Sequence, residues 1–249
     1  MYHFFVKPEQ ISGDRAVITG PDVNHIGNVL RMKPGEKVLL SAGEDWEYLC
    51  GIEEITKEEV RLTVFEENRD VRELPARITL WQGLPKSDKM ELIVQKAVEL
   101  GVSRIVPVET KRCIVKLDPK KAENRVRRWQ AIAESAAKQS GRHRIPEVGM
   151  PVSFREALKE ASSDQVRLIP YELAEGMDAT RKIIEEIPEG SRISVFIGPE
   201  GGFEETEIRE AEALGFRPVT LGKRILRTET AGLVILSFLL LRVSHLFYV

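Results

Sequence analysis

The residues best suited to binding and chemistry lie in a glycine-rich loop, residues 198–202, with the sequence Gly-Pro-Glu-Gly-Gly. The apolar, β-branched run before it, residues 193–197, predicts a buried strand. Glycine permits close approaches that a Cβ would forbid, so this loop can wrap a ligand with main-chain groups. Acidic residues then fill the first turn of a predicted helix that ends near Gly215. An ordinary turn between a strand and a helix is the plainer interpretation.

A second polar loop strengthens the case for a binding site. Residues 217–221 predict a short strand, and residues 222–230 open the C-terminal helix. The two loops offer one carboxylate, Glu200, and one guanidinium, Arg227. A carboxylate can remove a proton, and a guanidinium can stabilise developing negative charge. Alternatively, Glu200 holds its loop together by hydrogen bonds, and Arg227 pairs with Glu229 or with a neighbouring subunit.

Three motifs together resemble a known signature: Gly198-Pro-Glu-Gly-Gly202, Leu221-Gly222 and Ile225-Leu-Arg-Thr-Glu-Thr-Ala231. They resemble the SPOUT superfamily of RNA methyltransferases, and most closely the bacterial 16S ribosomal RNA uridine-N3-methyltransferase family. The resemblance implies S-adenosyl-L-methionine as cofactor and 16S ribosomal RNA as substrate, within the assembled small subunit. It also implies a homodimer and a deep trefoil knot. Knots are otherwise essentially absent from proteins, so the knot depends on the resemblance alone.

The resemblance implies a cofactor site built from three loops, the first of which follows a predicted strand at residues 166–170. Methyl transfer from this cofactor needs position and electrostatics from the protein, and no metal. Uracil N3 carries a proton, so a base must remove it and a cation must stabilise the charge on O2 and O4. Glu200 and Arg227 are the catalytic candidates. The implied cofactor-binding residues are Leu168, Pro170, Tyr171, Glu172, Ile197, Gly198, Pro199, Glu200, Gly201, Gly202, Leu221, Gly222, Ile225, Leu226, Arg227 and Thr228.

Other functions remain open. A non-catalytic RNA-binding assembly factor would use a basic helix and leave the glycine loops as turns, and a methyltransferase could act on another RNA nucleotide. A nucleotide-phosphate enzyme could use residues 198–202 as an anion nest. The sequence lacks Gly-x-x-x-x-Gly-Lys-[Ser/Thr] and Gly-x-Gly-x-x-Gly, which weakens that last reading.

Length and composition indicate a globular protein of one large or two modest domains, with 249 residues, 42% of them apolar and 31% charged. Its two cysteines form no Cys-x-x-Cys motif and its four histidines show no ligand spacing, so we expect neither a disulfide nor a metal site. No signal peptide opens the chain, and the apolar run at residues 231–241 is too short to span a membrane. A cytoplasmic protein is expected.

The charge is distributed unevenly although the net charge is only −2. Residues 111–144 carry eleven Lys or Arg and three acidic residues, whereas residues 172–212 carry twelve acidic and four basic residues. A basic segment within an acidic protein indicates an RNA-binding surface, although a solvated helix face would show the same pattern. Arg142 is the first choice for a phosphate or base contact, because its guanidinium is a rigid donor fork. The other RNA-binding candidates are Arg31, Lys86, Lys89, Arg112, Lys116, Arg125, Gln139 and Ser140.

The first part of the chain, residues 1–72, predicts a small β domain. Short strands are expected at residues 2–6, 16–19, 37–41, 47–55 and 60–66, with one helix at residues 21–31. Short strands at close spacing suggest a barrel. Asn24-His25 and Val29-Leu-Arg-Met32 resemble the PUA-like RNA-binding domain of the same methyltransferase family.

The second part, residues 73–249, alternates strands and helices after a charged, Pro-containing connection at residues 66–77. Strands are expected at residues 77–83 and 105–108, separated by a helix that Asp88 caps and Gly101 ends. A long amphipathic helix follows at residues 120–138, with Trp129 on its buried face. This rhythm predicts an α/β fold with a mostly parallel sheet and helices on both faces.

The last predicted helix, residues 230–247, is apolar on most of its faces. A helix lying on one sheet needs only one apolar stripe, so this helix needs a second apolar surface. We expect that surface to belong to a second copy of the chain in a two-fold dimer.

Overall fold

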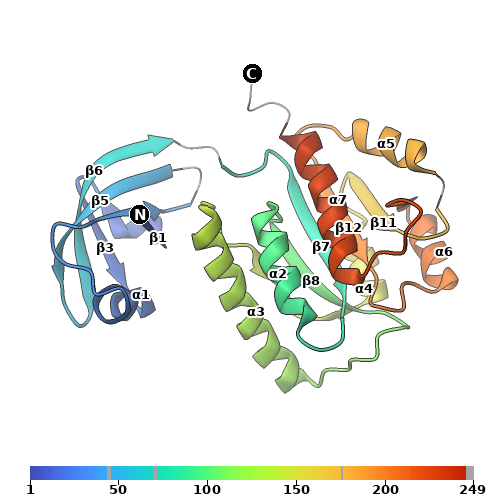
Figure 1. Ribbon diagram of the computed structural model, residues 1–249, viewed down its shortest axis with the longest axis horizontal. Coiled ribbons are helices and arrows are strands. Elements are labelled where there is room, and N and C mark those ends of the chain that lie inside the picture. The colour runs from blue at the N-terminus through green and yellow to red at the C-terminus, as the bar shows by residue number, and fades with distance from the viewer. Residues whose placement is uncertain (44–45, 70–71, 175, 245–249) are drawn as a thin grey trace. The chain divides into compact units, whose positions relative to one another are not determined.

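The computed structural model describes residues 1–43, 46–69, 72–174 and 176–244 (Figure 1). The chain falls into two compact units, which are treated separately below. The N-terminal unit is Met1–Glu73 with Ala137–Arg144, and the C-terminal unit is Leu74–Ala136 with Ile145–Val249. Residues 137–144 therefore belong with the first unit, although the sequence analysis placed them in the second domain.

The N-terminal unit is a six-stranded sheet in the order β1-β4-β5-β6-β3-β2. Its strands are β1 (Tyr2–Phe5), β2 (Ile11–Ser12), β3 (Arg15–Thr19), β4 (Lys37–Ser41), β5 (Trp46–Ile55) and β6 (Glu59–Arg69). β1 pairs with β4 in parallel, and the other pairs are antiparallel. Apolar residues alternate along the strands and bury side chains such as Phe4, Ile18 and Leu40 in one core. The strands expected in this region are confirmed.

The helix expected at residues 21–31 is shorter and irregular. α1 (Pro21–Asn24) continues into a π-helical turn, His25–Val29, in which the Leu30 N–H donates to the His25 carbonyl at 2.8 Å. Val23 and Ile26 are buried as the pattern predicted. Arg31 then takes a left-handed backbone conformation, with φ 54°, which ends the turn.

A cluster of polar side chains lies in the N-terminal unit, in which Ser41, Glu47 and His143 are buried and His3 is half-buried. His3 Nε2 is 2.8 Å from Ser41 Oγ, and the His3 and His143 rings lie 6.3 Å apart between centroids. Glu47 is within ion-pair distance of Arg72, at 3.5 Å. Burial, and then the positive potential of His143, Arg72 and Lys138, lowers the pKa of His3 to about 4.

We expect His3 to make the N-terminal unit acid-sensitive. Its folded-state pKa of about 4 lies below the ordinary 6.5, so the unfolded chain binds more protons between these values. Stability is therefore lost as the pH falls from 6.5 toward 4, and above 6.5 His3 has no effect. His3→Gln should flatten this loss in urea unfolding at about pH 7 and about pH 5. An unchanged pH dependence in the variant would contradict the expectation.

The C-terminal unit is a seven-stranded sheet in which every pairing is parallel. The order is β10-β8-β7-β12-β11-β13, and β9 also pairs with β8. The strands are β7 (Arg77–Gly83), β8 (Arg104–Glu109), β9 (Glu147–Val148), β10 (Val152–Ser153), β11 (Val166–Pro170), β12 (Arg192–Ile197) and β13 (Arg217–Val219). The predicted α/β fold with a parallel sheet is confirmed.

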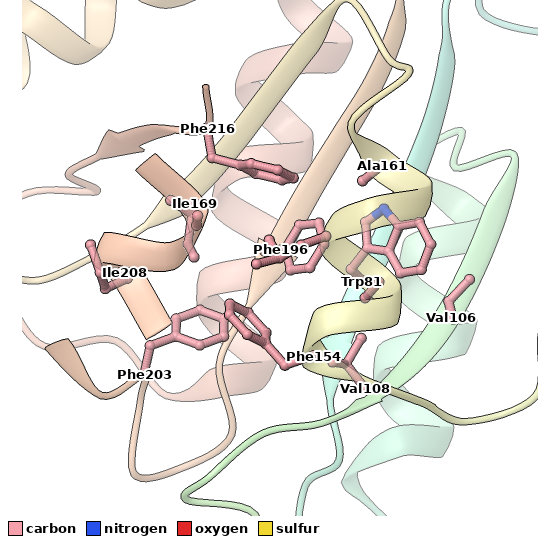
Figure 2. Close-up of a cluster of buried hydrophobic side chains, with 13 residues drawn as sticks. Trp81, Val106, Val108, Phe154, Ala161, Ile169, Phe196, Phe203, Ile208 and Phe216 are labelled. Carbon is pink, nitrogen blue, oxygen red and sulfur yellow. The ribbon is translucent and has the colours of Figure 1, made fainter. Parts of the chain in front are cut away.

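Helices cover both faces of this sheet. They are α2 (Lys89–Glu99), α3 (Pro119–Ser140), α4 (Phe154–Ala161), α5 (Met177–Glu185), α6 (Glu205–Ala213) and α7 (Thr228–Val243). Figure 2 shows the core on one face, where Trp81 of β7 stacks on Phe196 of β12 at 5.4 Å between ring centroids. Phe154 of α4 meets Phe196 edge-on, and Ile208 of α6 lies in the same cluster. α2 and α7 pack side by side on the other face (Figure 1).

The helices test several of the predictions made for single residues. Trp129 is 2% exposed, so it is a core residue of α3. Asp88 occupies the N-cap position of α2 but makes no side-chain cap hydrogen bond, which corrects the capping prediction. Gly101, at φ 86°, follows the end of α2 as expected. The end of the last predicted helix, residues 245–247, lies outside the described residues.

Candidate functional site

Three loops meet at the carboxyl ends of the strands of the parallel sheet. They follow β11, β12 and β13, which are neighbours in the sheet, and the carboxyl ends of parallel neighbours share an edge. The Tyr171 N–H donates to the Val219 carbonyl at 2.9 Å, which ties the first loop to the third. Together the loops surround a cavity of about 1020 Å³. The sheet order thus brings the first and third loops together although Tyr171 and Val219 are 48 positions apart in sequence.

Nearly all of the residues predicted to bind a cofactor line this cavity. The exception is Leu168, which is fully buried within β11 and does not reach the cavity wall. The predicted residues that do line it are Pro170, Tyr171, Glu172, Ile197, Gly198, Pro199, Glu200, Gly201, Gly202, Leu221, Gly222, Ile225, Leu226, Arg227 and Thr228. Lining residues that the sequence analysis did not name as cofactor contacts are Lys89, Leu173, Ala174, Gly176, Met177, Phe203, Thr220, Lys223, Arg224 and Ala231.

A chain of buried hydrogen bonds fixes two of the loops to the central sheet. Gln82 Nε2, on β7, donates to Thr228 Oγ1 at 2.9 Å, and Thr228 Oγ1 donates to the Gly198 carbonyl at 2.6 Å. Gln82 is fully buried and Thr228 is 5% exposed. Such bonds are strong in a low-dielectric interior, so the beginning of α7 and the glycine-rich loop are held together.

Gly83 allows the glycine-rich loop to lie directly against β7. A Cβ added at Gly83 would be 2.7 Å from both Pro199 Cδ and Pro199 N, closer than real contacts allow. The sequence analysis assigned neither Gly83 nor Gln82 to the site. A polar side chain at the end of the apolar strand Ile78-Thr-Leu-Trp-Gln82 was the available signal, because a buried amide needs hydrogen-bond partners.

The loop after β8 supports the glycine-rich loop from its other side. Arg112 Nη1 donates to the Gly201 carbonyl at 2.8 Å, and the Lys111 N–H donates to the buried carboxylate of Glu207 at 2.9 Å. The second Glu207 oxygen accepts the Glu204 N–H at 2.9 Å and so caps α6. Arg112, predicted as an RNA contact, therefore also supports the cavity wall.

Glu200 is held by several donors at the cavity edge. Its Oε1 accepts the Lys86 backbone N–H at 3.0 Å and is 3.2 Å from Lys89 Nζ, and Lys89 also pairs with Glu229 at 3.4 Å. Partial burial acts to raise the pKa of Glu200. Hydrogen bonds from its own backbone and from Lys86, together with Lys89, outweigh burial and lower the pKa below its ordinary value. These contacts favour the loop-holding interpretation over a strongly basic carboxylate.

Arg227 does not form the ion pair with Glu229 that the alternative interpretation predicted. It is exposed, lines the cavity, and occupies the N-cap position of α7. Glu229 pairs with Lys89 and not with Arg227. Within the described part of the chain, the Arg227 guanidinium makes no ion pair, so it is available to a ligand at the cavity mouth.

The predicted RNA-binding residues are divided between the two units. Arg142 is 6% exposed, and its Nη2 is 2.5 Å from Glu73 Oε2. Glu73 also accepts the His143 N–H at 3.0 Å. This is a buried structural ion pair, which argues against the preferred role of Arg142 as a phosphate contact, because its guanidinium is already bound. Arg31, Gln139 and Ser140 are exposed in the same unit.

In the C-terminal unit, Lys86, Lys116 and Arg125 are exposed. The outward face of α3 adds Lys120 and Arg127, also exposed. The basic segment found in the sequence therefore forms a cationic surface along the first turns of α3.

Among the described residues, no helix is long and apolar enough to cross a membrane. No metal-binding cluster of His, Cys, Asp or Glu occurs in the same part of the chain.

Comparison with known proteins gives consistent matches in both units. A family model described as an RNA methyltransferase domain matches residues 72–240, and one described as an RNA methyltransferase PUA domain matches residues 18–65. Ribosomal RNA small subunit methyltransferase E of Bacillus subtilis (strain 168) is 38% identical over 223 residues, 88% of this chain and 87% of that protein. The protein of the same name from Mesomycoplasma hyopneumoniae (strain 232) is 33% identical over 95% of this chain and 98% of its own.

A solved structure is similar over almost the whole chain. It is a ribosomal RNA small subunit methyltransferase E from Neisseria gonorrhoeae bound to S-adenosyl methionine, with 37% identity and a TM-score of 0.82. The similarity covers 95% of each chain. The fold is thus shared with that structure.

Proposed function

Since the chain belongs to the RNA methyltransferase family, we propose that it uses S-adenosyl-L-methionine to methylate N3 of a uridine in 16S ribosomal RNA. The proposal includes the assembled small subunit as substrate, the cytoplasm as location, and the trefoil knot that the resemblance implies. The observation that carries the proposal is the single cavity to which all three predicted loops contribute. Relatives named as small subunit methyltransferases support the choice of RNA.

The cavity suits S-adenosyl-L-methionine in size and chemistry. Its volume of about 1020 Å³ is large enough for a nucleoside-sized ligand, and its lining combines glycines with apolar residues such as Ile197 and Leu226. Gly202 and Gly222, at φ 66° and 110°, turn main-chain groups without a Cβ at the wall. The carboxylates of Glu172 and Glu200 suit the positive charges of the ligand. Once bound, the cofactor supplies an electrophilic methyl group.

The residues of the chain then orient the base and stabilise its charge. Arg227 donates hydrogen bonds to the uracil oxygens, where negative charge develops as N3 releases its proton to solvent water. The deprotonated N3 then takes the methyl group from the cofactor. Glu200 stays ionised and keeps Lys86 and Lys89 in place, which makes it a positioning residue in this proposal. Lys116, Arg125 and the exposed face of α3 contact RNA phosphates.

Mass spectrometry of ribosomal RNA tests this function. RNA from cells lacking the gene should have lost one N3-methyluridine of 16S RNA, and the purified protein should restore it on small subunits. Restoration of a methyl group on a different nucleotide would show another specificity. Binding of RNA without any methyl transfer would favour the non-catalytic assembly factor.

The proposed assembly is a two-fold homodimer formed through the outer face of α7. Thr228, Gly232 and Ile235 are buried on its inner face. Val234, Phe238 and Leu241 follow one another at helical spacing on the opposite side, and Leu241 is 71% exposed. A stripe of this kind suits a self-complementary interface, in which the same patch meets itself.

Leu241→Glu should therefore give a monomer, because a carboxylate would be buried without a partner in the interface. We expect sedimentation to show a halved mass and methylation to fall. Leu214→Glu is a matched control, since Leu214 is 44% exposed beyond the end of α6. A wild-type protein that is monomeric and fully active would exclude the dimer.

A further inference from the structure

Ile225 has an unusual position at the mouth of the cavity. It is 88% exposed, the largest fraction among the large apolar side chains that the structure describes. It lines the cavity and lies near the middle of the third loop. Single exposed apolar side chains are common on protein surfaces, but this one lines the cavity and is therefore placed to contact a ligand.

The loop that carries Ile225 is anchored at both ends. At one end the Gly222 N–H donates to Thr220 Oγ1 at 3.3 Å, and Thr180 Oγ1 donates to the Thr220 carbonyl at 3.0 Å. At the other end Thr228 is bound to the Gly198 carbonyl at 2.6 Å. The backbone is thus held in place on both sides of the five residues 223–227, whose side chains lie between these anchors.

Cationic side chains flank Ile225 on both sides. Lys223, Arg224 and Arg227 are exposed and line the cavity, and none of them forms an ion pair with a described residue. In contrast, Lys89 and Lys111 near the same cavity are each paired with glutamates. The apolar Ile225 side chain can contact a nucleobase, and the unpaired cations on either side of it can bind phosphates.

We propose that Ile225 inserts into the RNA stack at the place the target base leaves, while Lys223 and Arg224 bind the flanking phosphates. This inference rests on the proposed function. A base must leave its stack to reach a cavity, which costs unstacking energy, and an apolar side chain that takes its place restores part of the lost contact. The neighbouring cations then hold the opened backbone in position. The resemblance placed Ile225 among the cofactor-binding residues, and it lines the cavity; in this proposal its side chain contacts the RNA.

Steady-state kinetics on small subunits from a strain lacking the gene tests this role. Ile225→Ala should lower kcat/KM for the subunits by about 10- to 100-fold, as expected for loss of an apolar insertion. Ile225→Leu, which keeps the apolar volume, should recover most of the rate. Affinity for S-adenosyl-L-methionine in calorimetry and the mass in sedimentation should both stay unchanged. Ile114→Ala is the matched control, because Ile114 is 70% exposed and does not line the cavity.

Each other outcome has a distinct meaning. A matching loss of cofactor affinity in Ile225→Ala would assign Ile225 to the cofactor site, and a change of mass would assign it to the subunit interface. Unchanged kinetics would also overturn the proposal. If the wild-type protein itself transfers no methyl group to the subunits, the proposed function has failed before this test begins.

The phosphate contacts are tested by the salt dependence of RNA binding. Arg224→Gln should weaken binding and reduce the slope of log affinity against log salt by about one phosphate contact. Lys159→Ala, at an exposed cation of α4, should leave the slope unchanged. An unaltered slope in Arg224→Gln would remove Arg224 from the interface.

Discussion

Gly83→Ala is expected to abolish most cofactor binding while the protein stays folded. The added Cβ would lie 2.7 Å from Pro199 N and 3.0 Å from the Gly198 carbonyl carbon, so the backbone of the glycine-rich loop must move. Backbone atoms cannot rotate away as a side chain can. Overpacking of this kind costs about 1–3 kcal/mol. If that cost falls on the bound form, affinity drops by about 5- to 150-fold.

Calorimetry with S-adenosyl-L-methionine measures this loss, and circular dichroism checks the fold. Gly149→Ala is the matched control outside the cavity, because its Cβ would meet only the Val106 and Arg104 side chains, at 3.4 Å or more. Such distances are ordinary van der Waals contacts, so we expect unchanged affinity. Equal affinities in the wild type and a folded Gly83→Ala protein would show that the loop does not need its close approach to β7.

Arg227→Ala should cause the largest loss of catalysis. Removing a donor that stabilises developing negative charge costs about 100- to 1,000-fold in kcat. Because Arg227 is exposed and makes no ion pair within the described chain, its removal leaves no buried charge behind. We therefore expect a normally folded protein with nearly unchanged cofactor affinity.

Single-turnover rates on small subunits separate this effect from weaker binding. Arg227→Lys should keep part of the rate, because an ammonium supplies charge without the planar fork of donors. Lys182→Ala, at an exposed cation of α5, serves as the control. A fall in cofactor affinity as large as the fall in rate would leave Arg227 only the cofactor-binding role that the resemblance implies and contradict its role in catalysis.

The parts of the fold that could be predicted are those that depend on local patterns. Short apolar runs and turn signals placed most strands of both units, but not the two-residue strands β2, β9 and β10. Glycines marked the loops after β12 and β13. The meeting of those loops around one cavity came from the resemblance, because no local pattern specifies which strands become neighbours. Gly83 was missed for the same reason, since its contact with Pro199 joins residues more than 100 positions apart.

Arg142 illustrates how a charge pattern can mislead. Its basic surroundings in the sequence suggested an RNA contact, but the partner that determines its environment is Glu73, 69 positions earlier. A count of neighbouring charges does not include a carboxylate from so far away. Exposed residues of the same segment, such as Lys116 and Arg125, keep the environment that the pattern implied.

The hydrogen-bond chain from Gln82 through Thr228 to Gly198 also sets an order of events during synthesis. The ribosome adds Gln82 when about a third of the chain has been made, and Thr228 when about nine-tenths has been made. Until α7 docks, the glycine-rich loop lacks one of its supports and the cavity lacks a wall. A nascent chain therefore has no completed cavity until translation has passed residue 228. Cofactor binding is then a property of the finished protein and cannot guide the folding of its earlier parts.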